Sequence, residues 1–488
     1  MSTAPPAPGL RTGTAAGRWV IAAAVLGSGV AFLDGTVVNA ALPAISRDLH
    51  ADLADLQWVV TGYLLTLGSL LVIGGSLGDL FGRRRMFVYG LLGFATASLL
   101  CGVAPSTATL IAARCVQGVA AALLVPGSLA IISASFHPDD RAKAIGAWSG
   151  LGGIATAFGP FLGGWLIDAV SWRLVFLINL PLVALAVTLA LRHVPETSDP
   201  EGGHHVDVLG GALLALGLGG VVYALIEGPN TEWSVKTVAI GVVGAALLAA
   251  FFVEETRSRR PMVPLSVFRS RQFSGANATT LAVYAALSGA MFFVVVYLQT
   301  ALGYSAVEAG AAFVPITILM LAFSARAGAL AQRIGPRLPM TVGPVVAGTG
   351  IALFSLAGPG VSYWEGVLPG AVVLGVGLVL TVAPLTAAVL AAIDDRHAGI
   401  GSAINNAVAR LAGLLAIAVL PTVAGISGAG GRLDLSGGFD RAMYIAGGLC
   451  AFGGFISWLT IRTVKPVRSF TRGDVSAPCQ DFDLAEAS

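Results

Sequence analysis

The chain has 488 residues, of which 56% are hydrophobic and 11% are charged, and its mean hydropathy is +0.83. Because soluble proteins carry roughly 25% charged residues, this composition excludes an ordinary soluble protein and indicates a chain that folds within a membrane. The 63 glycines agree with this, since small residues let membrane helices pack closely. The net charge of +2, spread without a basic cluster, gives no indication of nucleic-acid binding.

Fourteen hydrophobic runs follow one another along the chain, each close to the roughly 20 residues that a helix needs to cross a bilayer. The first run is too long for a cleaved signal peptide and others follow it, so we expect it to be retained. We therefore predict an all-α membrane protein with 14 transmembrane helices. The predicted spans are 19–41, 56–77, 86–103, 108–133, 143–167, 172–191, 207–226, 237–253, 273–300, 307–331, 339–357, 365–391, 398–423 and 442–461.

Lysine and arginine are distributed unequally between the two sets of loops. With a cytoplasmic N-terminus, twenty of the 28 fall in the tails and cytoplasmic loops and five in the opposite loops. Positively charged loops remain on the cytoplasmic side of a membrane. The composition, rich in Ala, Gly and Arg and poor in Lys, favours a bacterial source with GC-rich DNA. We therefore predict a multi-pass protein of the bacterial inner (plasma) membrane with both termini in the cytoplasm.

Two pairs of similar segments indicate an internal repeat. Residues 75–84 resemble 328–337, and 139–146 resemble 394–401, at offsets of 253 and 255. All four lie at cytoplasmic ends of spans, which predicts a parallel repeat about an axis along the membrane normal. We predict two six-helix bundles with two extra helices inserted between them. The predicted domains are a disordered leader (1–18), the first bundle (19–191), a cytoplasmic linker (192–206), the inserted pair (207–254), a second linker (255–272), the second bundle (273–462) and a cytoplasmic tail (463–488).

Asp34 lies in the first span, where a carboxylate costs several kcal/mol unless it is paired, hydrated or protonated. Burial favours the neutral form of a carboxyl group, whereas a nearby cation favours the charged form. A group under both influences can exchange its proton when its surroundings change, so we predict a role in proton coupling. The alternative is an interfacial carboxylate that caps a helix or snorkels to the outer surface.

Two arginines inside spans also need an explanation. Arg114 in span four keeps its charge and must face a cavity or a partner. Asp34 is the candidate partner, directly or through Gln117 and water, and the alternative is a structural ion pair that never titrates. Arg410 in span thirteen either faces a cavity, where it would meet an anionic part of a substrate, or pairs elsewhere.

The glycine-rich span five contains Gly159, Pro160, Gly163 and Gly164. Glycines at this density allow another helix to pack backbone to backbone, and the proline bends its own helix. We predict a tight packing seam that also serves as a hinge or seal between the two bundles.

A short basic loop follows span two and contains Gly75, Asp79, Gly82, Arg83 and Arg84. Glycine at position 82 permits a tight turn, and the arginines hold the topology. From these residues alone the loop is as readily a topology anchor as a conformational gate.

The sequence contains no Gly-x-x-x-x-Gly-Lys-Ser/Thr loop, so ATP hydrolysis is not expected and transport must use an ion gradient or the substrate's own gradient. The four cysteines are far apart and form neither a metal-ligand spacing nor a disulfide framework. We expect no enzyme activity, no metal and no cofactor, and a protein that functions as a monomer.

Taken together, these residues resemble the major facilitator superfamily, and specifically its fourteen-span drug:proton antiporter branch. The loop at 75–85 is similar to the superfamily signature between helices two and three, and 114–118 to the motif linked to proton transfer. Residues 159–164 are similar to the antiporter motif of exporters. Further similarity to the branch lies in segments 34–43, 57–63 and 172–181.

The resemblance implies alternating access, in which two six-helix bundles rock around a central cavity and exchange protons for substrate. It assigns proton coupling to Asp34 and Arg114, and it assigns contacts that stabilise the outward-facing state to Asp79 and Arg83. The second half departs from this pattern, because Gln332 stands in the place of Asp79 and the Gly-Pro motif has no counterpart. The implied roles therefore rest on the first half.

Aromatic and amide side chains within the spans are candidates for substrate contact, because aromatic rings offer stacking and cation–π surface. Ordinary packing within a bundle is the alternative for each of them. Spans nine to fourteen lack extra acidic residues, which argues against dicationic substrates. The predicted substrate-binding residues are Asn39, Gln57, Trp58, Tyr63, Gln117, Phe292, Phe293, Tyr297, Asn405, Asn406 and Arg410.

We predict a proton-coupled antiporter that exports amphipathic drugs, antibiotics or natural products. Its expected partners are a small amphipathic substrate, protons and the lipid bilayer, without nucleotide or nucleic acid. The alternatives are a lipid or lipid-precursor exporter of the same fold, a metabolite importer or facilitator, and a membrane sensor without transport activity. The glycine seam of span five argues against an importer.

Overall fold

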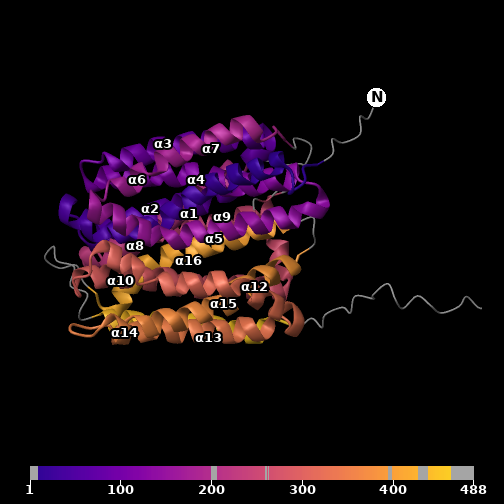
Figure 1. Ribbon diagram of the computed structural model, residues 1–488. Coiled ribbons are helices and arrows are strands. Elements are labelled where there is room, and N and C mark those ends of the chain that lie inside the picture. The colour runs from indigo at the N-terminus through magenta and orange to yellow at the C-terminus, as the bar shows by residue number, and fades with distance from the viewer. Residues whose placement is uncertain are drawn as a thin grey trace, which may run out of the picture.

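The computed structural model describes residues 9–198, 206–258, 261, 263–393, 398–426 and 438–462. Within this part of the chain, 14 helical segments are long and apolar enough to cross a membrane. The helices run roughly side by side, with the N-terminal half of the chain packed against the C-terminal half (Figure 1). The predicted fold class, two helical bundles with an inserted pair, is confirmed.

The first bundle is built from seven helices that make six spans, because α6 and α7 share one span. Side-chain caps explain several of the boundaries: Thr14 caps α1, and capping boxes begin α2 at Asp52 and α4 at Ser106. Gly82 joins α2 to α3 with a φ of 104°, a conformation that favours glycine. The helices are α1 (Ala15–Leu49), α2 (Leu53–Phe81), α3 (Arg83–Gly102), α4 (Thr107–Ser135), α5 (Pro138–Ala169), α6 (Leu174–Leu177) and α7 (Asn179–His193).

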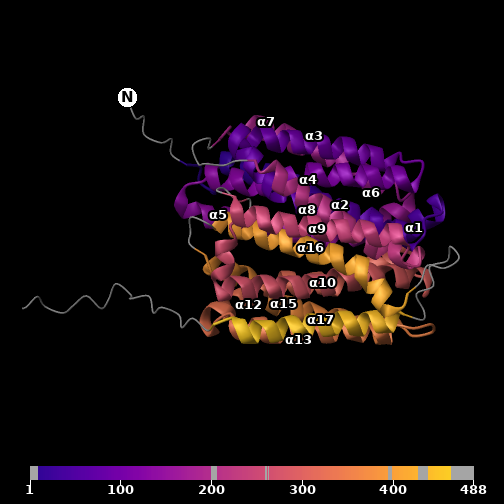
Figure 2. The ribbon, with the colours of Figure 1, turned by 180° about the vertical axis from the view of Figure 1, so that it is seen from behind.

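The inserted pair consists of α8 (Val208–Asn230) and α9 (Val235–Arg257). Helix α8 packs against α2 of the first bundle and against α16 of the second, while α9 packs against α8. The view from behind shows α8, α9 and α16 side by side between the bundles (Figure 2). The inserted pair therefore covers the line along which the two bundles meet.

The second bundle again makes six spans, two of which begin with a short helix that leads into a longer one. Its elements are η1 (Leu265–Arg269), α10 (Arg271–Thr300), α11 (Ala306–Ala311), α12 (Val314–Ile334), α13 (Arg337–Leu353), η2 (Phe354–Leu356), α14 (Tyr363–Gly366), α15 (Leu368–Ala391), α16 (Ala398–Ala424) and α17 (Phe439–Thr460).

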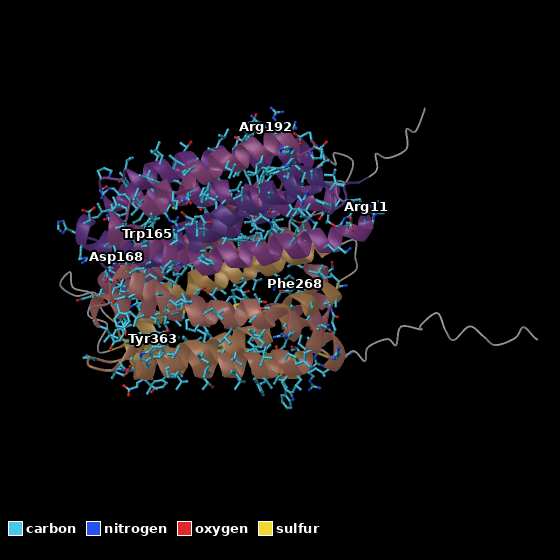
Figure 3. All side chains as sticks on the ribbon, viewed as in Figure 1. Arg11, Trp165, Asp168, Arg192, Phe268 and Tyr363 are labelled. Carbon is cyan, nitrogen blue, oxygen red and sulfur yellow. The ribbon has the colours of Figure 1, made fainter. Side chains whose placement is uncertain are left out.

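The two ends of the molecule differ in which parts of the chain they hold. The end that holds residues 9–14 and Thr460 is the terminal face, and the end that holds the α1–α2 turn is the far face. An even number of spans places the start of α1 and the end of α17 on one face. Arg11 marks the terminal face in Figure 3, and Asp168 and Tyr363 mark the far face.

The predicted disordered leader covers residues 1–18, but residues 9–14 are ordered against the first bundle. Positions 1–8 lie outside the described residues. Leu10 pairs with the α4–α5 connection, donating to the carbonyl of Ser135 at 2.8 Å and accepting from the amide of His137 at 3.1 Å. The backbone amide of Thr12 donates to Asp140 at 3.1 Å. Helix α1 then begins at Ala15, earlier than predicted, because backbone pairing with α4–α5 orders a segment whose own composition favours disorder.

The hydrophobic core differs between the two halves of the molecule. Toward the far face, one apolar cluster contains residues of both bundles, from Val37 of α1 to Phe292 of α10 and Ile417 of α16. Toward the terminal face, each bundle has a cluster of its own, around Phe87 in the first and Phe273 in the second. The bundles are therefore most tightly joined in the far half.

Candidate functional site

A buried polar cluster lies inside the first bundle, where α1, α3, α4 and α7 meet. Asp34 of α1 is 0% exposed and Arg114 of α4 is 1% exposed. Gln117 of α4, Ser98 of α3 and Asn179 of α7 complete the cluster, and each of the three is fully buried. Asp34 lies near the middle of a 35-residue helix, which does not agree with the alternative of an interfacial cap.

The cluster is connected by charge-assisted hydrogen bonds. Nη1 of Arg114 donates to Oδ2 of Asp34 and to Oε1 of Gln117, the latter at 2.6 Å. Nε of Arg114 donates to the carbonyl of Val59 at 3.0 Å, which ties the guanidinium to α2. The other carboxylate oxygen, Oδ1, accepts from Nε2 of Gln117 at 2.9 Å and from Nδ2 of Asn179 at 3.0 Å.

Ser98 and two aromatic rings close the cluster. Oγ of Ser98 accepts from Nε2 of Gln117 at 2.8 Å and from Nδ2 of Asn179 at 3.2 Å. The guanidinium of Arg114 lies 4.3 Å from the ring centroid of Tyr63 and 5.7 Å from that of Phe176. Buried opposite charges are tolerated when their remaining hydrogen-bonding groups are satisfied, and this arrangement satisfies most of them.

The structure thus brings together three predicted residues, Asp34, Arg114 and Gln117, and answers whether Asp34 and Arg114 touch. Tyr63 packs against Arg114 and donates its hydroxyl hydrogen to the carbonyl of Ala31 at 3.1 Å, and its predicted contact with substrate stays a prediction. Sequence reasoning missed Ser98, and it noted Asn179 only through the family resemblance. A polar side chain in an apolar span was the available signal.

The loop between α2 and α3 lies at the terminal face. The predicted loop is mostly helical, since Asp79 lies in the last turn of α2 and accepts from Arg83, the first residue of α3, at 2.7 Å. Arg84 contacts the first linker: Nη1 of its side chain donates to the carbonyl of Val194 at 3.1 Å, and its backbone amide donates to the side chain of Glu196 at 3.1 Å. The start of the predicted linker is therefore anchored on this loop.

The predicted glycine seam of α5 is a close-packed surface in the far half. A Cβ added at Gly159 or Gly163 would overlap Thr36 or Val37 of α1. At Gly164 an added Cβ would overlap the backbone of Ala306 in the second bundle. The carbonyl of Pro160 faces Gly310 of α11 at a distance that leaves no room for a side chain there. Gly75, by contrast, lies within α2, and a Cβ added there would be at an ordinary contact distance, 3.5 Å, from Pro126.

Among the described residues, hydrogen bonds from both bundles meet in the same half. Asp168, at the far end of α5 (Figure 3), accepts from the backbone amides of Ala306 at 3.2 Å and Val307 at 2.8 Å. Gln57 of α2 donates to the carbonyl of Ile417 at 2.5 Å. Gln299 of α10 donates to the carbonyl of Ala40 at 3.1 Å.

The terminal half of α5 is open by comparison. A Cβ added at Gly146, Gly150 or Gly153 would meet no heavy atom within 4 Å. These positions are exposed and share one side of the helix. The described contacts therefore show bundles closed at the far face and parted along α5 toward the terminal face.

The remaining predicted substrate-binding aromatic residues have partners within the protein in this arrangement. Phe292 and Phe293 are buried as an edge-to-face pair, and Tyr297 stacks on Phe439 with ring centroids 3.8 Å apart. Trp58 donates to Glu227 of α8 at 3.2 Å. These contacts are packing contacts, so a role of these rings in substrate binding stays a prediction.

The predicted amide and arginine side chains also have different surroundings from one another. Asn405 donates to Thr280 of α10 at 2.7 Å, and Asn406 bonds within its own helix. Asn39 is half-buried in α1. Arg410, like Gln57, reaches across the bundles, with its guanidinium 5.8 Å from the ring centroid of Phe32.

Fold and site together define a multi-pass membrane protein of two helical bundles with a buried ion pair inside the first bundle, an arrangement expected of a transporter. Residues 24–417 match the family model described as Major Facilitator Superfamily. The chain belongs to this superfamily.

Several curated relatives and solved structures are similar to it. The probable actinorhodin transporter of Streptomyces coelicolor is 34% identical over 88% of this chain and 78% of its own length. The tetracenomycin C resistance and export protein of Streptomyces glaucescens is 35% identical over 85% and 77%, and the methylenomycin A resistance protein of Bacillus subtilis is 34% identical over 84% and 88%. A crystal structure of the peptide transporter POT in complex with sulfate matches 92% of this chain and 96% of that chain, with 16% identity and a TM-score of 0.67. This last likeness concerns the fold.

Proposed function

We propose that this protein exports antibiotic-like amphipathic molecules in exchange for protons. The relatives that carry names of antibiotic export and resistance support the substrate class. The single observation that carries proton coupling is the fully buried Asp34–Arg114 pair in the first bundle. Inside a membrane protein, a carboxylate without water keeps its charge only while a cation lies beside it, so a change in that contact favours uptake or release of a proton.

In this proposal Asp34 binds and releases the transported proton. Arg114, Gln117 and Asn179 together donate to both oxygens of the carboxylate and stabilise its ionised form. Uptake of a proton removes the charge and weakens the hold of the carboxyl group on Arg114. Because Arg114 is also bonded to the carbonyl of Val59, the change is transmitted from α1 to α2.

We further propose that the terminal face is cytoplasmic, with both termini there, in a bacterial plasma membrane. The positively charged loops support this orientation. The far face is then the outer side, and the described arrangement, joined at the far face, is open toward the cytoplasm. Gly159, Gly163 and Gly164 would seal the outer side, and Asp79 and Arg83 would stabilise the opposite, outward-facing arrangement.

Flux into proteoliposomes under an imposed pH gradient tests the proposal. With a fluorescent amphipathic cation as substrate, the wild type is expected to transport and Asp34→Asn to lose gradient-driven transport. Asp55→Asn, which changes a half-exposed acid at the start of α2, serves as the control and is expected to transport normally. Equal transport by the wild type and Asp34→Asn would remove Asp34 from the proton path.

A further inference from the structure

Two amide side chains, of Gln117 and Asn179, donate to the carboxylate of Asp34, but they differ in whether their own oxygen has a hydrogen-bond partner. Gln117 employs both ends of its amide: Nε2 donates to Asp34 and Ser98, and Oε1 accepts from Arg114 at 2.6 Å. The charged donor therefore fixes which way this amide points. Turning it over would place its N–H groups against the guanidinium.

Asn179 employs only one end of its amide. Nδ2 donates to Oδ1 of Asp34 at 3.0 Å and to Oγ of Ser98 at 3.2 Å. Its own Oδ1 is buried and has no hydrogen-bond partner, in a residue that is 0% exposed. A buried acceptor without a partner is unfavourable, so this orientation is maintained by the carboxylate that it faces.

Asn179 lies at a break between two helices. It is the first residue of α7, directly after the break at Ile178 that separates α6 from α7. Its side chain points into the cluster between α1 and α3. Within the described part of the chain no cation contacts its amide, whereas Arg114 contacts the amide of Gln117.

We propose that Asn179 is a positioning residue that serves both protonation states of Asp34. This inference rests on the proposed function, because it requires that Asp34 takes up a proton. When the carboxylate is ionised, Nδ2 of Asn179 donates to it, as the structure shows. When a proton binds to Oδ1 of Asp34, the amide turns by half a rotation about Cβ–Cγ, and its oxygen accepts the new O–H.

Ser98 completes this exchange. In the ionised state its Oγ accepts from both amides. After the rotation the hydroxyl can donate its own hydrogen to Oδ1 of Asn179, so the turned amide oxygen has two donors. Asn179 loses its two N–H···O bonds, to Asp34 and Ser98, and gains two O–H···O bonds from the same two groups, and the proton stays on Asp34. Its N–H groups turn to the side that Oδ1 occupies in the ionised state. The neutral carboxyl group is thereby stabilised by a partner other than Arg114.

The ionisable groups that the described chain places around Asp34 come from several elements. Arg114 contacts it from α4, and the ring of Tyr63 from α2 lies against that guanidinium. Cys101 of α3 lies 3.7 Å from Oε1 of Gln117. Arg410 of α16 approaches from the second bundle, beyond Phe32.

Infrared difference spectroscopy of the full chain in lipid, between high and low pH, tests the inference. The wild type is expected to show a C=O band of a hydrogen-bonded, protonated carboxyl group, and Asp34→Asn identifies the band by its loss. In Asn179→Leu, which has a similar size but no hydrogen-bonding atoms, the band should move to the higher wavenumber of a free carboxyl group. Gradient-driven transport should fall roughly three- to tenfold, as loss of one hydrogen bond implies.

Two further variants complete the test. Asn179→Thr retains a hydroxyl that donates and accepts, so its band should lie between those of the wild type and Asn179→Leu. If the leucine variant fails to fold, a shift of the threonine band from the wild-type position still tests the inference. Asn277→Leu alters another buried amide, in α10, and should leave the band unchanged. A wild-type band that neither Asn179 variant shifts would overturn this inference alone. Absence of the Asp34 band in the wild type would overturn proton uptake at Asp34, and with it both proposals.

Discussion

At the scale of single residues, the geometry of Arg114 shows why its charge is tolerated inside the bundle. The guanidinium has three described oxygen partners, on Asp34, Gln117 and Val59, and lies over the ring of Tyr63. A planar cation with several fixed donors is needed for this arrangement, and an ammonium group offers only a point charge. The identity of the cation at this position, and not only its charge, therefore matters.

We expect Arg114→Lys to lower gradient-driven transport roughly tenfold, as loss of a charge-assisted hydrogen bond of about 1.5 kcal/mol implies. Initial rates in proteoliposomes with matched protein content would measure this. Arg85→Lys is the matched control, because Arg85 is exposed and contacts Tyr89 on the surface of α3. Unchanged transport by Arg114→Lys would show that charge alone is sufficient.

Sequence reasoning located the ion pair because charged side chains are rare in membrane helices and must find partners. It missed Ser98 because an uncharged hydroxyl is common and inexpensive in such helices. It predicted that Tyr63 and Trp58 contact substrate, but it could not predict their described partners, because neither aromatic character nor position in a span states which side of a helix a ring faces. Those directions depend on how α2 packs against α4 and α8, which a single sequence does not contain.

At the scale of elements, α5 is divided into two different surfaces. Its far half carries glycines whose missing side chains allow contact with α1 and α11, and its terminal half carries glycines that face open space. The sequence shows the same residue type in both halves. The glycine-rich pattern therefore predicted the seam, but only the packing reveals where the seam ends.

Gly164→Ala is expected to keep the far face from closing fully, because the added Cβ would overlap the backbone of Ala306. Overpacking of this kind costs about 1–3 kcal/mol. In a background without native cysteines, a membrane-impermeant thiol reagent should modify Ala40→Cys, a buried site in the far half of α1, faster when Gly164→Ala is present.

The matched control for this experiment is Gly150→Ala, on the same helix, where an added Cβ meets nothing within 4 Å. It should leave both labelling and transport unchanged. Equal labelling rates in the two variants would argue that the seam does not act as a seal.

At the scale of the whole molecule, the two bundles are joined at one end and separate at the other. One apolar cluster crosses between them toward the far face, and hydrogen bonds from Gln57, Asp168 and Gln299 reinforce it. The order of spans and the parallel repeat could be predicted from hydropathy and from the two segment echoes. The closed end could not, because a sequence that supports two arrangements of its bundles does not state which one is populated.

Asp168→Asn is expected to shift the population toward arrangements open at the far face. The side chain accepts from two backbone amides of α11 through separate oxygens, and an amide retains only one acceptor. Loss of one such bond, about 1.5 kcal/mol, corresponds to a roughly tenfold change in the ratio of the two arrangements.

Distances between spin labels at Val170→Cys and Trp364→Cys, both on exposed side chains near the far face, would report this shift. Asp48→Asn is the control, because Asp48 bonds to Arg173 and Trp172 within the first bundle. An identical distance distribution in Asp168→Asn and in the wild type would show that the bond does not hold the far face closed.

The inserted helices α8 and α9 form a hairpin that a gene could gain or lose as one unit. The pair enters and leaves through the terminal face, so it adds two membrane crossings without reversing the direction of any later helix. Helix α9 adds only an outer layer, whereas α8 shares an apolar cluster with α2 and α16. A gene could therefore gain or lose this hairpin in one step and keep every other segment correctly oriented, provided that the surface beneath α8 is made compatible with lipid.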